Sequence, residues 1–299
     1  MFGLKELLKV AGIQTNPKIL EKEENLKKCL ELMHVASKNG SQLLIFPECS
    51  ITGYCFSSLY EGLDVAEPIP GPSTNEIGSL CKDLGIYTIV GLLEIDRDKC
   101  YNALAFFGPE GIIGKYRKIH LPYLGIDRYA TPGDKPLKVY TTEIGKIGLN
   151  ICFDVRLPES ARVMALMGAE IIVLPTNWPR GAEAIPKYII NARAYENRVN
   201  YVAVNRVGVE RGFRFIGRSK IVDYAGQTLA EASAVNEEII YAQLNLKGAQ
   251  EKHVTIIPGK FELPLFEARR PEFYGLISQK IEISDHKLKI ASKKQTLIH

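Results

Sequence analysis

The stretch formed by residues 146–178 constrains the fold more than any other part of this 299-residue chain. An apolar run at 147–151 ends at Cys152, and a turn and a helix that begins at a proline follow it. A second apolar run, at 171–174, ends at Pro175. This pattern predicts a strand, a helix and a second strand, with the cysteine at the carboxyl end of the first strand. Ligands bind at that edge of α/β sheets, so we predict that Cys152 is a nucleophile.

Apolar runs and helical spacing predict further elements on both sides of this stretch. The segment 50–72 is rich in Gly, Ser, Tyr and Pro and is expected to be a long loop. We expect strands at 9–14, 43–46, 87–93, 101–107, 112–116, 137–140, 146–151, 201–205, 215–222 and 238–244, and helices at 20–38, 72–84, 158–167 and 186–198.

The order of these elements predicts the fold class. Strands alternate with helices in the first half, and Pro109-Glu110-Gly111 is expected to be the turn of a hairpin. Both features together predict an α/β layered fold with mixed sheets. Because we find no repeat and no linker, we expect a single domain over residues 1–299, in which 246–299 is an extended C-terminal tail.

Composition excludes several classes of partner and site. The net charge is only +4 and the basic residues are scattered, so we expect no binding to nucleic acid or to an anionic membrane. We find no apolar run long enough to span a bilayer and no signal peptide, and we expect the cytoplasm. The six cysteines form no CxxC pair, which favours free thiols over disulfides or a zinc site.

Three ionisable groups share one position, directly after a predicted strand. Glu48 follows LLIFP, Lys118 follows GIIGKYR and Cys152 follows IGLNI. A carboxylate can take the proton of a thiol as general base, and an ammonium can stabilise the oxyanion of a tetrahedral intermediate. Taken singly, each has an alternative reading: a buried small hydrophobe for the cysteine, a capping carboxylate for the glutamate and a solvated charge for the lysine.

The segments around these residues resemble the nitrilase superfamily of carbon–nitrogen hydrolases. In that family, the glutamate after FP, the lysine of a KYRK-like segment and the cysteine of a CYD-like segment form a catalytic triad. The match puts these roles on Glu48, Lys118 and Cys152. The similar motifs cover nearly the whole chain, in order: FPE at 46–48, GKYRKIHLP at 114–122, NICFDVRLPE at 150–159, LPTNWP at 174–179, ARAYENRVNYVAVNRVG at 192–208 and RRPEFYG at 269–275.

The resemblance also implies a fold and an assembly. The fold is a four-layer αββα sandwich with two mixed β-sheets between helix layers. Subunits of the family pair as homodimers or higher homo-oligomers across the helix after the cysteine strand and the later ARAxEN helix, which correspond here to 158–167 and 186–198. The C-terminal tail often exchanges contacts across that interface. The chemistry needs no metal and no organic cofactor.

We expect further residues to bind substrate. Asn177 and Trp178 follow a strand on the same sheet edge, and Tyr54 lies in the loop after Glu48. The backbone N–H of Phe153 is expected to help hold the oxyanion. Many family members carry a second glutamate after the lysine, and the comparable carboxylate here is Asp127. Asp127 either takes the role of that glutamate with its shorter side chain or caps the loop before Thr131-Pro132-Gly133.

The leading hypothesis is hydrolysis of a small amide through a thioester on Cys152. The alternatives are a nitrilase, an acyltransferase and a non-catalytic binding or assembly protein that keeps the fold. Phe153-Asp154 after the cysteine resembles the amidase branches, and Asp154 is expected to hold the turn. His120 could be mistaken for the base of a Cys–His pair, but we expect it to be satisfied by backbone and Glu48 to be the base.

Overall fold

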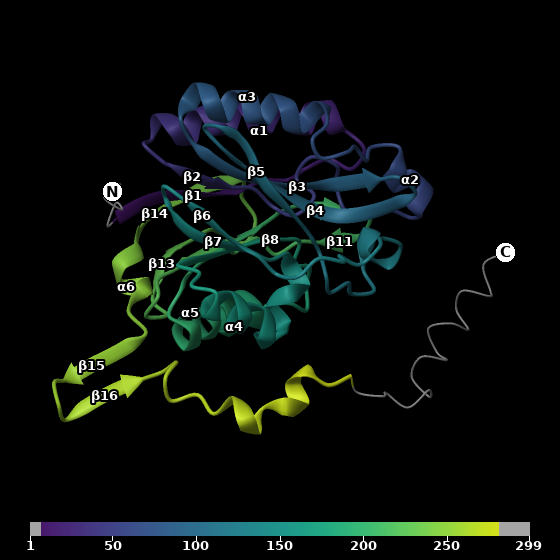
Figure 1. Ribbon diagram of the computed structural model, residues 1–299. Helices are drawn as coiled ribbons and strands as arrows, with labels where there is room; N and C mark the ends of the chain where they lie inside the picture. The colour runs from purple at the N-terminus through teal and green to yellow at the C-terminus, as the bar shows by residue number, and fades with distance from the viewer. Residues whose placement is uncertain (1–6, 281–299) are drawn as a thin grey trace. The chain divides into compact units, whose positions relative to one another are not determined.

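The computed structural model describes residues 7–280 of the chain. Its compact first unit extends to Lys252 and contains two six-stranded mixed sheets with helices on their outer faces (Figure 1). This confirms the predicted α/β class and the four-layer αββα sandwich. Within residues 7–280, helices of the length and apolar character needed to cross a membrane are absent.

The first sheet is built mainly from the N-terminal half of the chain. Its two parallel pairs are β1–β2 and β2–β3, and the other neighbours are antiparallel. β4 and β5 are joined by the two residues Pro109 and Glu110, which confirms the expected hairpin turn. In spatial order the strands are β14 (Glu238–Asn245), β1 (Leu7–Gln14), β2 (Leu43–Ile45), β3 (Tyr87–Asp96), β4 (Lys99–Gly108) and β5 (Gly111–Arg117).

The second sheet contains the stretch with which the sequence analysis began. β7, β8 and β9 are parallel, and antiparallel strands flank them on both sides. The sheets pack closely face to face, because a Cβ added at Gly12 of β1 would lie 3.2 Å from Val204 of β9. In spatial order the strands are β13 (Thr228–Glu231), β12 (Lys220–Val222), β9 (Asn200–Asn205), β8 (Ile171–Thr176), β7 (Gly145–Leu149) and β6 (Val139–Thr142).

Helices cover the outer face of each sheet (Figure 1). α1 (Lys22–Lys38) and α3 (Pro72–Leu84) cover the first sheet, and α4 (Pro158–Leu166) and α5 (Ile190–Asn197) cover the second. α1 buries Leu26, Cys29 and Met33, whose spacing places them on one helix face. α3 begins at a proline and ends before Gly85, whose φ of +64° suits a glycine C-cap.

Several element boundaries differ from those expected. Leu20 has a φ of +69°, so α1 begins at Lys22. β8 continues through Pro175, which is tolerated because β7 pairs with β8 only as far as Val173. The expected strand at 215–222 is wrong before Lys220, because Gly217 and Arg218 both have positive φ.

Short elements complete the first unit. The loop expected at 50–72 includes the helix α2 (Leu59–Leu63), which the Ser58 side chain caps. The helix expected at 186–198 begins as a π-helical turn, η3 (Ile185–Ile189), and continues as α5. The remaining short elements are η1 (Gly125–Arg128), η2 (Cys152–Arg156), β10 (Val209–Glu210), β11 (Phe213–Arg214) and α6 (Leu246–Gln250).

The second unit begins at His253. Its described part is an antiparallel hairpin followed by two short helical turns: β15 (His253–Ile257), β16 (Phe261–Pro264), η4 (Pro271–Phe273) and η5 (Gly275–Ser278). The segment expected as an extended tail therefore contains the helix α6 and this hairpin, and its last part, 281–299, lies outside the described residues.

Candidate active site

Each of the three predicted catalytic residues lies within three positions of the end of a strand. Glu48 comes after β2, and Lys118 comes after β5, where its backbone N–H donates to Asn102 O at 2.9 Å. Cys152 opens the helical turn η2 beyond β7. Glu48 and Lys118 thus come from the first sheet and Cys152 from the second. Their relative positions depend on the face-to-face packing of the two sheets.

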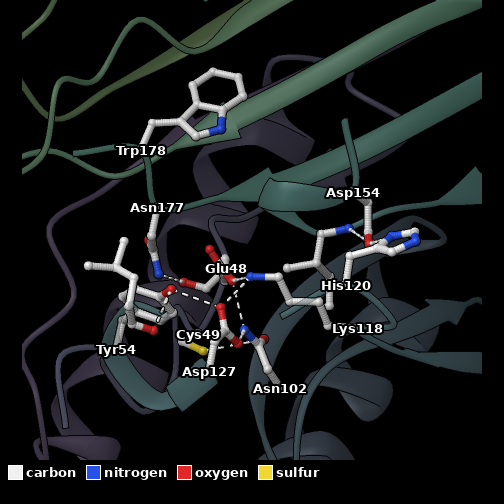
Figure 2. Close-up of polar contacts among 12 residues, drawn as sticks. Glu48, Cys49, Tyr54, Asn102, Lys118, His120, Asp127, Asp154, Asn177 and Trp178 are labelled. Atoms are coloured by element: carbon white, nitrogen blue, oxygen red, sulfur yellow. Dashed lines mark hydrogen bonds and ion pairs between the residues drawn. The ribbon is translucent and has the colours of Figure 1, made fainter. Parts of the chain in front are cut away.

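Lys118 lies between two carboxylates (Figure 2). Its Nζ donates to Oε1 of Glu48 at 2.7 Å and to Oδ2 of Asp127 at 2.5 Å. All three side chains are buried, so water screens these contacts little. Asp127 lies in η1, and its carboxylate is part of this buried network.

Two neutral side chains complete the network. Asn102, in β4, donates through Nδ2 to Oε1 of Glu48 at 2.7 Å and to Oδ1 of Asp127 at 2.8 Å. The hydroxyl of Tyr54 donates to Oδ2 of Asp127 at 2.8 Å. Tyr54 is among the residues predicted from the sequence and Asn102 is not, although a buried asparagine within the apolar strand YNALAFF requires polar partners.

Burial and charge act in opposite directions on the network. Burial raises the pKa of Glu48, Lys118 lowers it again in part, and the charge of Asp127 adds to the rise. Burial alone would lower the pKa of Lys118, but Asp127 and Glu48 outweigh it and hold that pKa well above its ordinary value. The lysine therefore stays a cation at neutral pH, and the basicity of the glutamate is increased.

Cys152 lies beside this network in a strained backbone conformation. Its φ is +44°, a region that L-residues rarely adopt. Burial and the charge of Glu48 raise the pKa of the thiol to about 12, and Lys118 opposes the rise. The resting thiol is therefore protonated at neutral pH, so a nucleophilic attack by the sulfur needs a base.

Asp154 fixes the turn that carries Cys152. Its Oδ2 accepts hydrogen bonds from the Ile151 backbone N–H at 2.8 Å and from the Tyr116 hydroxyl at 2.8 Å. This confirms the expected structural role of Asp154. The expectation that backbone satisfies His120 is wrong: its Nδ1 lies 2.7 Å from Oδ1 of Asp154 (Figure 2), because the ends of β5 and β7 bring the two side chains together.

The other predicted binding residues lie in different positions. Nδ2 of Asn177 donates to the backbone oxygen of Glu48 at 3.0 Å, which ties the second sheet to the first. The indole of Trp178 is buried and points away from the Glu48–Lys118 network in Figure 2. Its backbone N–H donates to Asn205, and its side chain packs in the core. Phe153 follows Cys152 within η2 and is half-buried.

The geometry brings a thiol, a carboxylate and a fixed cation together. Glu48 Oε2 is buried and accepts no hydrogen bond from the described residues, so this oxygen is available for a proton. Within residues 7–280, groups of three or more His, Cys, Asp or Glu that could hold a metal ion are absent. The arrangement can support acyl transfer through a covalent intermediate on sulfur.

Known proteins match this chain over most of its length. A nitrilase of Pyrococcus abyssi is 40% identical over 271 residues, covering 90% of this chain and 99% of the relative. An omega-amidase of Bos taurus is 32% identical over 279 residues, covering 87% and 94%. The crystal structure of a carbon–nitrogen hydrolase from Helicobacter pylori G27 aligns with a TM-score of 0.83 at 27% identity, covering 92% of this chain and 99% of that one.

The family profile described as carbon–nitrogen hydrolase matches residues 9–253, which nearly coincide with the first compact unit. The match includes both sheets and every residue of the Glu48–Lys118–Asp127 network. With this match and relatives that align end to end, the chain belongs to the carbon–nitrogen hydrolase family of the nitrilase superfamily.

Proposed function

We propose that this carbon–nitrogen hydrolase cleaves a small amide through a thioester on Cys152. The Cys152 sulfur attacks the carbonyl carbon while Oε2 of Glu48 takes the thiol proton. Glu48 then gives that proton to the departing nitrogen, the C–N bond breaks, and ammonia or an amine leaves. Water next attacks the thioester, Glu48 accepts a proton from it, and the acid is released as the thiol is restored.

The observation that carries this proposal is the unpaired buried oxygen of Glu48 beside a thiol that needs a base. Oε1 of Glu48 is occupied by Lys118 and Asn102, and Oε2 has no partner among the described residues. With its pKa of about 12, Cys152 does not supply a preformed thiolate. The carboxylate therefore accepts the proton as the sulfur attacks, and burial raises its basicity for this role.

Lys118 and the backbone N–H of Phe153 stabilise the oxyanion in this mechanism. Because Lys118 is held by two carboxylates, it contributes a fixed positive charge rather than a proton. Asp127 fixes the lysine and, through Tyr54, the loop that follows Glu48. We assign Asp127 to the role that a second glutamate has in many family members.

Amides are favoured over nitriles by the residues after the nucleophile. Phe153-Asp154 resembles the amidase branches of the family, and one end-to-end relative is an omega-amidase. Because the nitrilase of Pyrococcus abyssi is 40% identical to this chain, nitrile hydrolysis is the second candidate function. Both reactions use the same nucleophile and differ in the carbon that it attacks.

The test compares amides and nitriles that share one side chain. Ammonia release is measured for matched ω-amide, aliphatic amide, N-carbamoyl and nitrile substrates with the wild type, Cys152→Ala and the control Cys81→Ala, which removes a buried thiol in α3. We expect turnover of amides, loss of turnover only in Cys152→Ala, and an acyl adduct on Cys152 by mass spectrometry of the quenched reaction. Turnover of nitriles alone would favour the second candidate, and full activity of Cys152→Ala would refute both.

A further inference from the structure

Asn102 is a neutral side chain that contacts both carboxylates of the site. It lies in β4, where its partner in β3 is Leu93, and its Nδ2 reaches Glu48 and Asp127 at 2.7 and 2.8 Å. These two bonds use both hydrogens of the amide nitrogen. Asn102 thus holds two like charges at fixed positions around the Lys118 ammonium.

The orientation of the Asn102 amide follows from charge. If the amide were turned over, Oδ1 would face two carboxylate oxygens and gain no donor from either. With Nδ2 toward the carboxylates, Oδ1 points the other way and needs a donor of its own. That donor is the thiol of Cys49, whose Sγ lies 3.5 Å from Oδ1 of Asn102 (Figure 2).

Cys49 occupies a position where a cysteine is unusual. Its φ is +50°, a conformation in which glycine or asparagine is the ordinary choice. Its backbone oxygen accepts hydrogen bonds from Thr52 N and Gly53 N, so the turn could form around any residue that tolerates this φ. What glycine would lack here is the thiol that contacts Asn102.

The Cys49 thiol remains a donor throughout the working pH range. Burial raises its pKa well above the ordinary value, and the neighbouring charge of Glu48 raises it further. A protonated thiol carries one S–H, and Asn102 Oδ1 is the acceptor within its reach. The Cys49 thiol is therefore a hydrogen-bond donor, whereas the Cys152 thiol is the proposed nucleophile. Both thiols are buried beside Glu48.

We propose that Cys49 and Asn102 form a positioning pair, in which the cysteine S–H fixes the amide and the amide N–H groups hold the general base Glu48 and the lysine-binding Asp127. This inference rests on the proposed function, because it assigns Glu48 as the base. Both act through the contacts that Asn102 makes with Glu48 and Asp127.

The pair predicts a change in pH dependence. The hydrogen bond that Asn102 donates to Glu48 stabilises the charged form of that carboxyl, so its loss makes protonation of Glu48 easier and shifts the acid limb of kcat/KM to higher pH. The titratable groups that face Glu48 are Lys118 after β5, Asp127 in η1, Cys152 in η2, and Cys49 and Tyr54 in the loop after β2.

The decisive experiment compares Cys49→Ser with Cys49→Gly in the full chain. Serine keeps a donor, whereas glycine suits the backbone conformation but has none. We expect Ser to stay within about threefold of wild-type kcat/KM, and Gly to lose about tenfold with its acid limb moved upward. A purely structural turn residue would give the opposite order, since glycine removes backbone strain. Gly equal to or better than Ser would overturn the proposal.

Asn102→Leu tests the other member of the pair. We expect kcat/KM to fall about 100-fold and the acid limb to rise by about one pH unit. Circular dichroism establishes that the variant is folded, and Cys81→Ala controls for the loss of a buried thiol elsewhere. An unmoved acid limb in folded Asn102→Leu would overturn the pair, and the Cys49 comparison decides the matter if this variant fails to fold.

One further measurement separates failure of the pair from failure of the proposed function. Alkylation of Cys152 by iodoacetamide is followed by intact-mass spectrometry against pH for the wild type and both Cys49 variants. A wild type without amide turnover and without alkylation of Cys152 contradicts the proposed function. An active wild type with identical pH profiles in Cys49→Ser and Cys49→Gly contradicts the positioning pair alone.

Discussion

Nζ of Lys118 lies 2.5 Å from Oδ2 of Asp127, nine residues along the chain. The same ammonium is 2.7 Å from Glu48, so one buried cation is shared between two buried carboxylates. Desolvation of three charges is costly, and their mutual attraction offsets that cost only while all three are present. The site therefore affects the stability of the fold as well as its chemistry.

Lys118→Met is expected to destabilise the protein strongly. It leaves Glu48 and Asp127 buried without a cation, and removal of one partner from a buried ion pair costs about 3–5 kcal/mol of unfolding free energy. Urea denaturation measures this loss. The matched control is Lys28→Met, which breaks an exposed pair with Glu237 and is expected to cost less than about 1 kcal/mol.

A compensated variant sharpens this prediction. Neutralising both carboxylates together with the lysine, in Lys118→Met/Glu48→Gln/Asp127→Asn, removes the uncompensated charge. We expect this triple variant to recover part of the lost unfolding free energy while turnover stays absent. Equal unfolding free energies of Lys118→Met and Lys28→Met would show that Lys118 does not offset the burial of the two carboxylates.

The pH dependence of kcat/KM should have an acid limb set by Glu48. Burial raises the pKa of this carboxyl above its ordinary value of 4.5, and only the ionised form can accept the thiol proton. Activity is therefore lost as the pH falls through that raised value. On the alkaline side, Cys152 has a pKa of about 12 and Lys118 stays protonated, so we expect no loss below about pH 9.

Asp127→Asn provides the internal check on this assignment. The Asp127 charge raises the pKa of Glu48, so its removal should move the acid limb to lower pH, opposite to the shift expected for Asn102→Leu. Rate measurements over the stable pH range on one amide substrate are sufficient. An alkaline limb near neutrality, or an acid limb that moves upward in Asp127→Asn, would show that another group titrates.

Local signals in the sequence predicted most elements of the fold. The helix Pro72–Leu84 was predicted with its observed bounds, because a proline and a glycine mark its two ends. The strands before Glu48, Lys118 and Cys152 were likewise predicted, although only β2 and β7 are largely buried and most of β5 is half-buried or exposed. Boundaries failed where a residue adopts positive φ without being glycine, as Leu20 does, because no residue type marks that conformation.

Contacts between distant segments were less accessible to sequence reasoning. Asn102 is 54 residues from Glu48 and 25 from Asp127, and only the register between strands brings them together. His120 was assigned to backbone because Asp154, 34 residues away, gave no local sign of pairing with it. The family motifs identified the charged members of the site but not the neutral residues that orient them.

Gly91 in β3 allows the turn of Glu48 and Cys49 to lie against the sheet. A methyl group at this position would lie 2.4 Å from Cys49 N and 2.8 Å from Pro47 O. Gly91→Ala must therefore displace Glu48, and we expect kcat/KM to fall about 100-fold and the unfolding free energy to fall by about 1–3 kcal/mol. Kinetic assays and urea denaturation measure the two effects.

Gly78→Ala in α3 is the matched control. Its added methyl would meet the Phe107 ring at 3.4 Å, which is ordinary contact, and alanine favours the helix. We expect wild-type kcat/KM from this variant. If Gly91→Ala were equally active, the close approach of β3 to the Glu48 turn would have no part in positioning the base.

The outer faces of α4 and α5 are expected to pair two copies of the chain. Val163, Leu166 and Met167 at the end of α4 are 42–47% exposed, and Tyr195 of α5 is 63% exposed. Apolar side chains gathered in this way favour association, and the family resemblance implies a subunit interface on these helices.

We expect a dimer or larger assembly in light scattering, and Val163→Asp should yield monomers because each copy would bury an unpaired charge. Val35→Asp, at a valine of α1 that is 51% exposed, is the control that should leave the assembly unchanged. A monomeric wild type, or loss of assembly in Val35→Asp alone, would place the interface elsewhere or exclude it.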